Sequence, residues 1–295
     1  MSAPRSPIGS RRRLGAELRR LRRNAGMTLE EVAELMTCST SKISRLETGK
    51  AIPKVPDVNE LMRIYGVTSE TERDMILRLV HDGRAHGWWE PLTEGVQPEK
   101  FILDAPGRYP AVESEATMVR SFTVAFVSGL LQTPDYARTV LTDALPHHSP
   151  EEIERLVALR MKRQEALHRT DPPPLEVLAV LDEGVLCRPV GGPEMMAAQL
   201  EQILKLAELP NVDVRVWPFE RGISRAHLGN FVLLTIPEER GSDVVYIEGH
   251  AGETFLDSRS DVDVYEEVFA DALEQSLPRA RSLEVVERYR RQFAS

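Results

Sequence analysis

Apolar residues follow a helical period through about the first 85 residues of the chain. Leu14, Leu18 and Leu21 are spaced i, i+4 and i+7 with arginines on the opposite side, so they predict an amphipathic helix that ends at Gly26. Four more helices are predicted in the same region, over about residues 29–36, 39–48, 55–65 and 69–83. Residues 1–9 are rich in Pro, Ser and Gly and predict a disordered tail. The pattern therefore predicts a five-helix domain over residues 10–84.

A strand-like alternation appears only in the second half of the chain, after three consecutive prolines at 172–174. Strands are predicted at about 175–183, 212–219, 230–236 and 243–249, and helices at about 109–126 or a part of it, 134–144, 150–168, 193–209, 260–275 and 278–293. The strand–helix–strand order over 175–219 is that of a right-handed crossover between parallel strands, and antiparallel strands follow it. We therefore predict a mixed α/β domain over residues 108–295, joined to the first domain by a linker at 85–107. The predicted fold class is mainly α with an α/β C-terminal domain.

Charge is distributed unevenly along the chain, whose net charge is -9. Residues 1–54 contain 12 Lys and Arg against 5 Asp and Glu, whereas the rest of the chain contains 25 against 41. A basic segment on an acidic body is the electrostatic pattern of a protein that presents one end to a polyanion. Cys38 and Cys187 are too few for a disulfide framework, and no apolar run approaches the roughly 20 residues of a membrane helix. A cytoplasmic location is expected.

The second and third predicted helices form a helix-turn-helix pattern, because both are short, a tight turn joins them, and the later one is polar and basic. Ile43 and Leu46 are the few apolar residues of the third helix, so most of its surface faces away from the core. Such a helix fits the DNA major groove, where its N-terminal side chains reach base edges. Arg45, one turn further on, is the best candidate for a bidentate contact with guanine. The predicted DNA contacts are Thr28, Ser39, Thr40, Ser41, Lys42, Arg45, Thr48 and Lys50, with Thr28 and Lys50 placed for phosphates.

The segment GMTLEEVAELMTCSTSKISRLETGKAIP, residues 26–53, resembles the helix-turn-helix of the large phage-repressor and xenobiotic-response-element family. The match rests on a Val-Ala pair in the second helix and on a Ser-x-Ser-x-Ile-Ser-x-Leu-Glu-x-Gly-x-x-x-Pro run that ends at Pro53. The resemblance implies DNA binding through the third helix. It also implies that Glu47 is a scaffold residue, paired with Arg22 of the first helix.

The chain departs from this pattern in the side chains that read bases. Many relatives have glutamine at the positions of Leu29 and Thr40. Because the Thr40 side chain is short, direct base reading is expected to rest more on Lys42 and Arg45.

Several segments of the acidic domain resemble the C-terminal domain of a numerous group of actinobacterial, antitoxin-like transcriptional regulators that carry this helix-turn-helix. The segments are SGLLQTPDYAR at 128–138, RQEAL at 163–167, LDEGVLCRPVGGPEMMAAQLEQIL at 181–204 and VVYIEG at 244–249. Together the two resemblances cover nearly the whole chain. Members of the group are often encoded beside a very small partner protein, so the resemblance implies a protein-binding or antitoxin-like role for this domain.

The residues of the acidic domain do not predict an enzyme. Asp182 and Glu183 stand near a predicted strand end, but neighbouring carboxylates in a strand point to opposite faces, and no nucleophile–base pattern accompanies them. The run RPVGGP at 188–193 lacks the spacing of a phosphate-binding loop and is interpreted as a strand-to-helix turn. No cofactor, catalytic or metal site is predicted.

These observations predict a sequence-specific DNA-binding transcription regulator that acts on the nucleoid. Because one small helix-turn-helix reads few bases, a homodimer on a pseudo-palindromic operator is expected, with two recognition helices about 34 Å apart. Two alternatives stay open. One is an antitoxin-like module that binds a small partner protein and autoregulates. The other is a one-component sensor whose α/β domain binds an unknown small-molecule effector.

Overall fold

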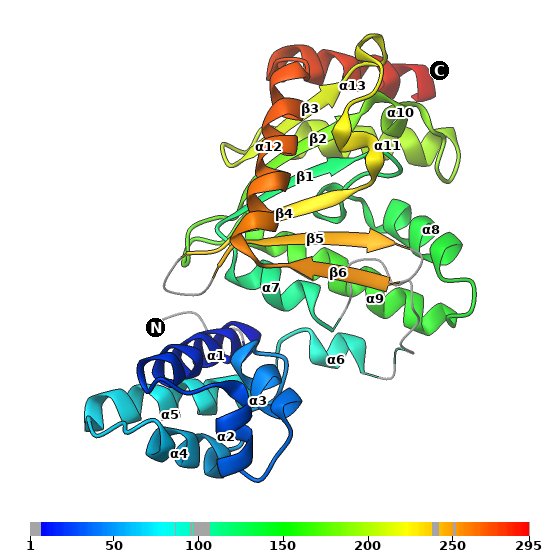
Figure 1. The fold of residues 1–295 in the computed structure, drawn as a ribbon. Coiled ribbons are helices and arrows are strands. Elements are labelled where there is room, and N and C mark those ends of the chain that lie inside the picture. The colour runs from blue at the N-terminus through cyan, green and yellow to red at the C-terminus, as the bar shows by residue number, and fades with distance from the viewer. Residues whose placement is uncertain are drawn as a thin grey trace. The chain divides into compact units, whose positions relative to one another are not determined.

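The computed structural model describes residues 7–85, 87–94, 96, 107–237, 242–249 and 252–294. The chain divides after Trp88 into two compact units, of which the first holds the N-terminal helices and the second holds a β-sheet with its helices (Figure 1). The protein is mainly helical with a mixed α/β second unit, which confirms the predicted fold class. No helix in the described ranges is both long enough and apolar enough to cross a membrane.

Five helices are described in the first unit, and they enclose one apolar core in which Leu18, Ile43 and Met62 are fully buried. The helices are α1 (Pro7–Asn24), α2 (Leu29–Leu35), α3 (Thr40–Glu47), α4 (Val55–Ile64) and α5 (Glu70–Arg84). Since α1 begins at Pro7, residues 7–9 belong to a helix and not to the predicted disordered tail. A proline in the first helical turn is favourable because its missing N–H would have no partner there. Residues 1–6 lie outside the described ranges.

α1 lies very close to the end of α3 at Gly15. A Cβ atom on Gly15 would stand 2.6 Å from the Leu46 carbonyl oxygen and 2.5 Å from that of Glu47, so a side chain there would force the two helices apart. Gly49 follows α3 with a φ of 67°, and its Cβ position lies 2.9 Å from the Cα of Arg12. Because neither glycine has a side chain, α1 can pack closely against the C-terminal end of α3.

The strands described in the second unit form one sheet in the order β3-β2-β1-β4-β5-β6. They are β1 (Met118–Thr123), β2 (Glu176–Asp182), β3 (Val212–Trp217), β4 (Phe231–Thr235), β5 (Val244–Gly249) and β6 (Gly252–Leu256). β1, β2 and β3 are parallel, and β4, β5 and β6 continue antiparallel from β1. The predicted parallel pair with a crossover helix, followed by antiparallel strands, is confirmed.

The helices of the second unit cover both faces and one edge of this sheet. They are α6 (Glu90–Thr93), α7 (Tyr109–Glu115), α8 (Pro134–Ala144), α9 (Pro150–Gln164), α10 (Glu183–Cys187), α11 (Pro193–Leu206), α12 (Arg259–Gln275) and α13 (Arg279–Ala294). α12 crosses one face (Figure 1), where Phe122, Trp217 and Phe231 of the sheet pack with its Phe269. At the β3 edge the N–H of Val216 donates to Ser282 Oγ of α13 at 3.0 Å.

Four elements were not predicted from the sequence: β1, β6, α10 and α6. Of the segment 109–126, expected to be helical, only α7 is a helix, and β1 follows it as an inner strand of the sheet. β1 was missed because it is covered on both faces and yet contains Arg120 and Ser121, so it shows neither a clean alternation nor an apolar run. β6 and α10 were not predicted either, because both are only five residues long. α6 lies inside the predicted linker, most of whose other residues fall outside the described ranges.

Candidate DNA-binding site

α2 and α3 begin at capped N-termini and are joined by a tight turn. Thr28 Oγ1 accepts the Glu31 N–H at 3.2 Å while Glu31 Oε2 accepts the Thr28 N–H at 2.8 Å, which is a capping box. Ser39 Oγ accepts the Lys42 N–H at 3.3 Å at the start of α3. Between the two helices Thr37 has a φ of 50°, the left-handed conformation that lets the chain reverse sharply. The local sequence thus builds the helix-turn-helix that the pattern predicts.

α3 has one buried and one exposed face. Ile43, Leu46 and Glu47 are buried against the first unit's core. The exposed residues among the predicted DNA contacts are Thr28, Ser39, Thr40, Ser41, Arg45 and, just after the helix, Lys50. Because residues four apart share a face of a helix, Ser41 and Arg45 lie side by side on the exposed face. This face has the composition of a groove-reading surface: short hydroxyls and one arginine.

Three of the predicted DNA contacts already have partners within the chain. Ser39 caps α3, and Thr48 Oγ1 donates to Ser44 O at 2.8 Å. The Thr28 N–H, expected to bind a phosphate, donates instead to the Glu31 carboxylate. A phosphate at this position would have to displace a like charge. The first function of these three hydroxyl residues is therefore to close helix ends.

Lys42 is also held within the chain, by a residue that sequence analysis did not single out. Its Nζ lies 2.9 Å from Asp57 Oδ2 in the first turn of α4. The two residues are fifteen positions apart, and only the packing of α4 beside α3 brings them together.

The pair between Arg22 and Glu47, which the resemblance implies, is present and nearly buried. Arg22 Nε donates to Glu47 Oε1 at 2.6 Å and Nη2 donates to Oε2 at 2.9 Å. The Glu47 side chain is only 3% exposed, and Arg19 approaches its other side at 3.5 Å. Hydrogen bonding to Glu47 raises the pKa of Arg22, so the guanidinium stays protonated in this nearly buried position. Glu47 therefore serves the scaffold of α3 and does not face DNA.

Two further exposed cations lie on the helices before and after the helix-turn-helix. Arg23 at the end of α1 and Lys54 at the N-cap of α4 are exposed, like Arg45 and Lys50. Within the described ranges none of these four side chains forms an ion pair. Sequence analysis counted Arg23 and Lys54 in the basic segment without giving them a role. Their free charge makes them candidates for contacts with DNA phosphates.

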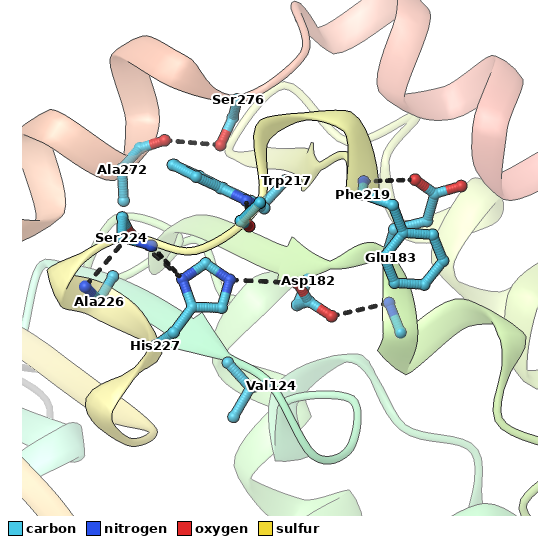
Figure 2. Close-up of polar contacts among 12 residues, drawn as sticks. Val124, Asp182, Glu183, Trp217, Phe219, Ser224, Ala226, His227, Ala272 and Ser276 are labelled. Atoms are coloured by element: carbon cyan, nitrogen blue, oxygen red, sulfur yellow. Dashed lines mark hydrogen bonds and ion pairs between the residues drawn. The ribbon is translucent and has the colours of Figure 1, made fainter.

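The second unit carries its own polar cluster, at the carboxyl ends of the parallel strands. The segment between β3 and β4, residues 218–230, crosses these ends, and we call it the cap loop; it contains η3 (Phe219–Arg221) and η4 (Arg225–Leu228). His227 Nε2 lies 3.2 Å from Asp182 Oδ2 at the end of β2 (Figure 2). The His227 ring centroid is 5.0 Å from that of Phe122 and 5.2 Å from that of Trp217, edge-on in both cases. One histidine thus ties the loop to all three parallel strands.

Glu183 fixes the start of the cap loop, as Figure 2 also shows. Its Oε2 accepts the Phe219 N–H at 2.9 Å, while its Oε1 accepts the Tyr289 hydroxyl and the Arg288 Nη2 hydrogen, both at 2.8 Å. The adjacent acids Asp182 and Glu183, considered above as an enzymatic alternative, therefore both anchor this loop.

The contacts connect Ser224 to His227 and His227 to Asp182, in the order of the nucleophile, base and acid of a catalytic triad. Their geometry, however, is that of a helix cap. His227 Nδ1 accepts the Ser224 N–H at 3.0 Å, closer than the Ser224 Oγ at 3.2 Å. Ser224 Oγ in turn accepts the Ala226 N–H at 3.3 Å. Since the imidazole lone pair is directed at a backbone N–H, the geometry closes the first turn of η4 and does not present an activated hydroxyl.

The cap loop presents apolar side chains although it is firmly anchored. Phe219, Ile223 and Leu228 are 55%, 86% and 93% exposed. The loop that carries them is also held by Trp217 Nε1, which donates to Gly222 O at 2.9 Å. Apolar side chains that a rigid loop holds in solvent are typical of a contact surface for another molecule.

The segments SGLLQTPDYAR (128–138) and RQEAL (163–167), which carry part of the family resemblance, meet in the interior of the second unit. Arg163 donates to both oxygens of Glu113 at 2.8 Å, and the two side chains are only 2% and 4% exposed. Gln164 Nε2 donates to Gly129 O and Gln132 O at 3.0 and 2.8 Å. These hydrogen bonds therefore hold the turn after β1 against the end of α9.

Comparison with protein families gives two matches. Residues 107–288 match a family described as Domain of unknown function (DUF5753), and residues 13–75 match a helix-turn-helix domain. The first match spans the whole sheet and more than half of the chain, and the second spans α2 and α3. Curated proteins and solved structures show no match to the chain. The helix-turn-helix match supports a DNA-binding regulator, with the first unit as its DNA-binding part.

Proposed function

The chain belongs to the DUF5753 family, and from its helix-turn-helix match we propose that it is a sequence-specific transcription regulator whose α3 enters the DNA major groove. The observation that carries the proposal is the exposed face of α3, where Ser41 and Arg45 stand opposite the buried Ile43 and Leu46. Arginine can donate two hydrogen bonds to O6 and N7 of one guanine. Arg45 is suited to this contact because no acidic side chain among the described residues occupies its guanidinium.

We further propose that the protein binds as a homodimer. α3 is only eight residues long, so its exposed face can contact only a few base pairs. Two copies related by a two-fold axis would place their α3 helices in successive turns of the major groove, about 34 Å apart. The operator is therefore expected to be a pseudo-palindrome. The proposal assigns no catalytic reaction to the chain.

The direct test is the affinity of Arg45 variants for DNA that the wild-type protein selects from a random duplex pool. Arg45→Ala should weaken binding to this DNA roughly 10- to 100-fold, because a bidentate base contact is lost. Arg45→Lys keeps the positive charge but loses the two parallel N–H donors of the guanidinium, so this variant should also lose preference at one base pair. Arg63→Ala is the matched control: Arg63 is exposed, and its partner is Glu60 on the same helix.

The proposal is wrong if Arg45→Ala and Arg63→Ala bind the selected DNA equally. It is also wrong if the wild-type protein enriches no sequence from the pool. Mass measurement of the complex decides between one and two copies on the selected site.

For the second unit we propose binding of a small partner protein, and the cap loop is the observation that favours it. Phe219, Ile223 and Leu228 are three exposed apolar side chains on one anchored loop. Three side chains cover far less than the ~800 Å² that each partner buries in an interface of standard size. A small partner that inserts one helix or one loop fits such a surface better than a second copy of this chain does.

Co-expression with a very small protein encoded beside the gene, of the kind that the family resemblance implies, tests this second proposal. Ile223→Ser combined with Leu228→Ser should abolish a complex that survives gel filtration. Val264→Ser on α12 is the control, because Val264 is likewise exposed, at 53%, but lies outside the loop. If the double variant changes only the self-association of the chain, the surface serves a second copy and the proposal is wrong.

A further inference from the structure

One ion pair distinguishes Lys42 from the other cations near the recognition face. Four cations lie between residues 40 and 54, all of them described: Lys42, Arg45, Lys50 and Lys54. In this stretch only Lys42 has an acidic partner, Asp57, at 2.9 Å. The Lys42 side chain is 42% exposed and that of Asp57 is 22% exposed, so the pair lies at the surface beside the predicted groove contacts.

The position of both charges follows from the helix ends that carry them. Lys42 is in the first turn of α3, where its backbone N–H donates to the Ser39 cap. Asp57 is the acidic residue in the first turn of α4, a helix whose N-cap, Lys54, makes no side-chain capping bond. An acid is stabilised there by the helix dipole. Asp57 is therefore held by its own helix, and it holds Lys42 in turn.

The pair changes what Lys42 can offer to DNA. An ammonium has three N–H donors, and Asp57 occupies one of them. The other two remain able to donate to acceptors on a base edge. The charge of the pair as a whole is zero, however, so the attraction to the phosphate backbone that an isolated lysine would add is largely cancelled.

We propose that Asp57 is a specificity-determining residue that makes Lys42 a reader of base edges instead of a phosphate contact. It does so by neutralising the lysine toward the phosphate backbone while fixing its ammonium beside Ser41 and Arg45. The effect is to lower affinity for DNA of arbitrary sequence more than affinity for the operator. This inference rests on the proposed DNA-binding function of α3.

The test is a double-mutant cycle between Asp57→Asn and Lys42→Ala, measured in the full chain on selected and on scrambled duplexes over a range of salt. Asp57→Asn should raise affinity for the scrambled duplex on the order of threefold to tenfold and steepen the slope of log K against log salt by about 0.9 per subunit. Affinity for the selected duplex should rise less, so the ratio between the two should fall. Lys42→Ala should leave the slope on scrambled DNA unchanged in the wild type and lower it by about 0.9 in the Asp57→Asn protein.

Glu60→Gln is the matched control, since Glu60 is an exposed acid of the same helix that pairs with Arg63 at 2.6 Å. It removes the same charge from α4 without freeing Lys42. If Asp57→Asn and Glu60→Gln change affinity and slope equally, Asp57 acts only through net charge and the inference is wrong. An unchanged ratio of selected to scrambled affinity in Asp57→Asn would also overturn it. Both outcomes leave the proposed function intact, because that function is tested separately by Arg45→Ala against Arg63→Ala and by enrichment of a sequence from the random pool.

Discussion

Arg22 of α1 and Glu47 of α3 are joined by two hydrogen bonds of 2.6 and 2.9 Å, between side chains that are 11% and 3% exposed. The remaining arm of the arginine, Nη1, donates to Met27 O at 2.8 Å, just before α2. One ion pair thus joins the supporting helix, the start of α2 and the recognition helix.

Replacement of Glu47 should destabilise the first unit strongly. Glu47→Ala leaves the Arg22 guanidinium without its carboxylate in a nearly buried position, so the free energy of unfolding should fall by about 3 kcal/mol. Chemical denaturation of the full chain, followed by hydrogen exchange in α1–α3, measures this change. Glu60→Ala, which removes the solvent-accessible partner of Arg63, should change it much less. Equal losses of unfolding free energy in the two variants would show that the buried pair stabilises the fold no more than the Glu60–Arg63 pair does.

Substitution of the capping residue of α3 should change stability, whereas substitution of its exposed residues should change base preference. Ser39→Ala removes the bond to the Lys42 N–H and should lower the free energy of unfolding by about 1 kcal/mol, with base preference unchanged. Thr40→Ala and Ser41→Ala alter exposed side chains and should change base preference without changing stability. Sequence selection from a random pool, paired with thermal unfolding of each variant, distinguishes the two classes. A shift in base preference with Ser39→Ala would contradict the assignment of Ser39 as a cap only.

Loss of His227 should release the cap loop. His227→Ala removes the contact with Asp182 and the packing against Phe122 and Trp217, so the unfolding free energy of the second unit should fall by about 2 kcal/mol. Amide hydrogens of residues 219–228 should exchange faster. Leu228→Ala is a stringent control, since its side chain is 93% exposed although it follows His227 directly. Unchanged exchange in His227→Ala would mean that the other anchors suffice to hold the loop.

Tyr289 should make the protein less stable at alkaline pH. Burial, followed by its hydrogen bond to Glu183, raises the pKa of Tyr289 to about 12. An unfolded chain releases this proton near pH 10. The folded state therefore binds the proton more tightly, and the resulting stabilisation is complete below about pH 10 and is lost as the pH rises to 12. Compared with Tyr289→Phe, the wild-type melting temperature should fall more steeply across that interval; parallel curves would contradict the assignment.

The first unit could be predicted almost fully from the sequence because its signals are local. The leucine spacing of α1 and the caps Thr28 and Ser39 each act within a few residues. The pair of Arg22 with Glu47 was implied by resemblance to a family and not by any local signal.

Interactions between distant residues could not be predicted in the same way. The sequence around Lys42 shows no partner for its charge, because Asp57 comes beside it only when α4 packs in the folded unit. His227 and Asp182 are 45 residues apart in sequence and meet only because the chain crosses back over the sheet. β1 carries polar residues in a strand that the sheet buries on both faces, so its composition hides its position.

The strand order also determines when each of the two units can fold during translation. The first unit has all its core residues by Val80, whereas β1 must wait for β4, in which Thr235 lies opposite Met118, and for α12 beyond it. At ribosomal rates of about 5–20 residues per second, the interval between the two events is on the order of ten seconds or more. A nascent chain therefore contains every residue of α1–α5 well before the sheet of the second unit can close.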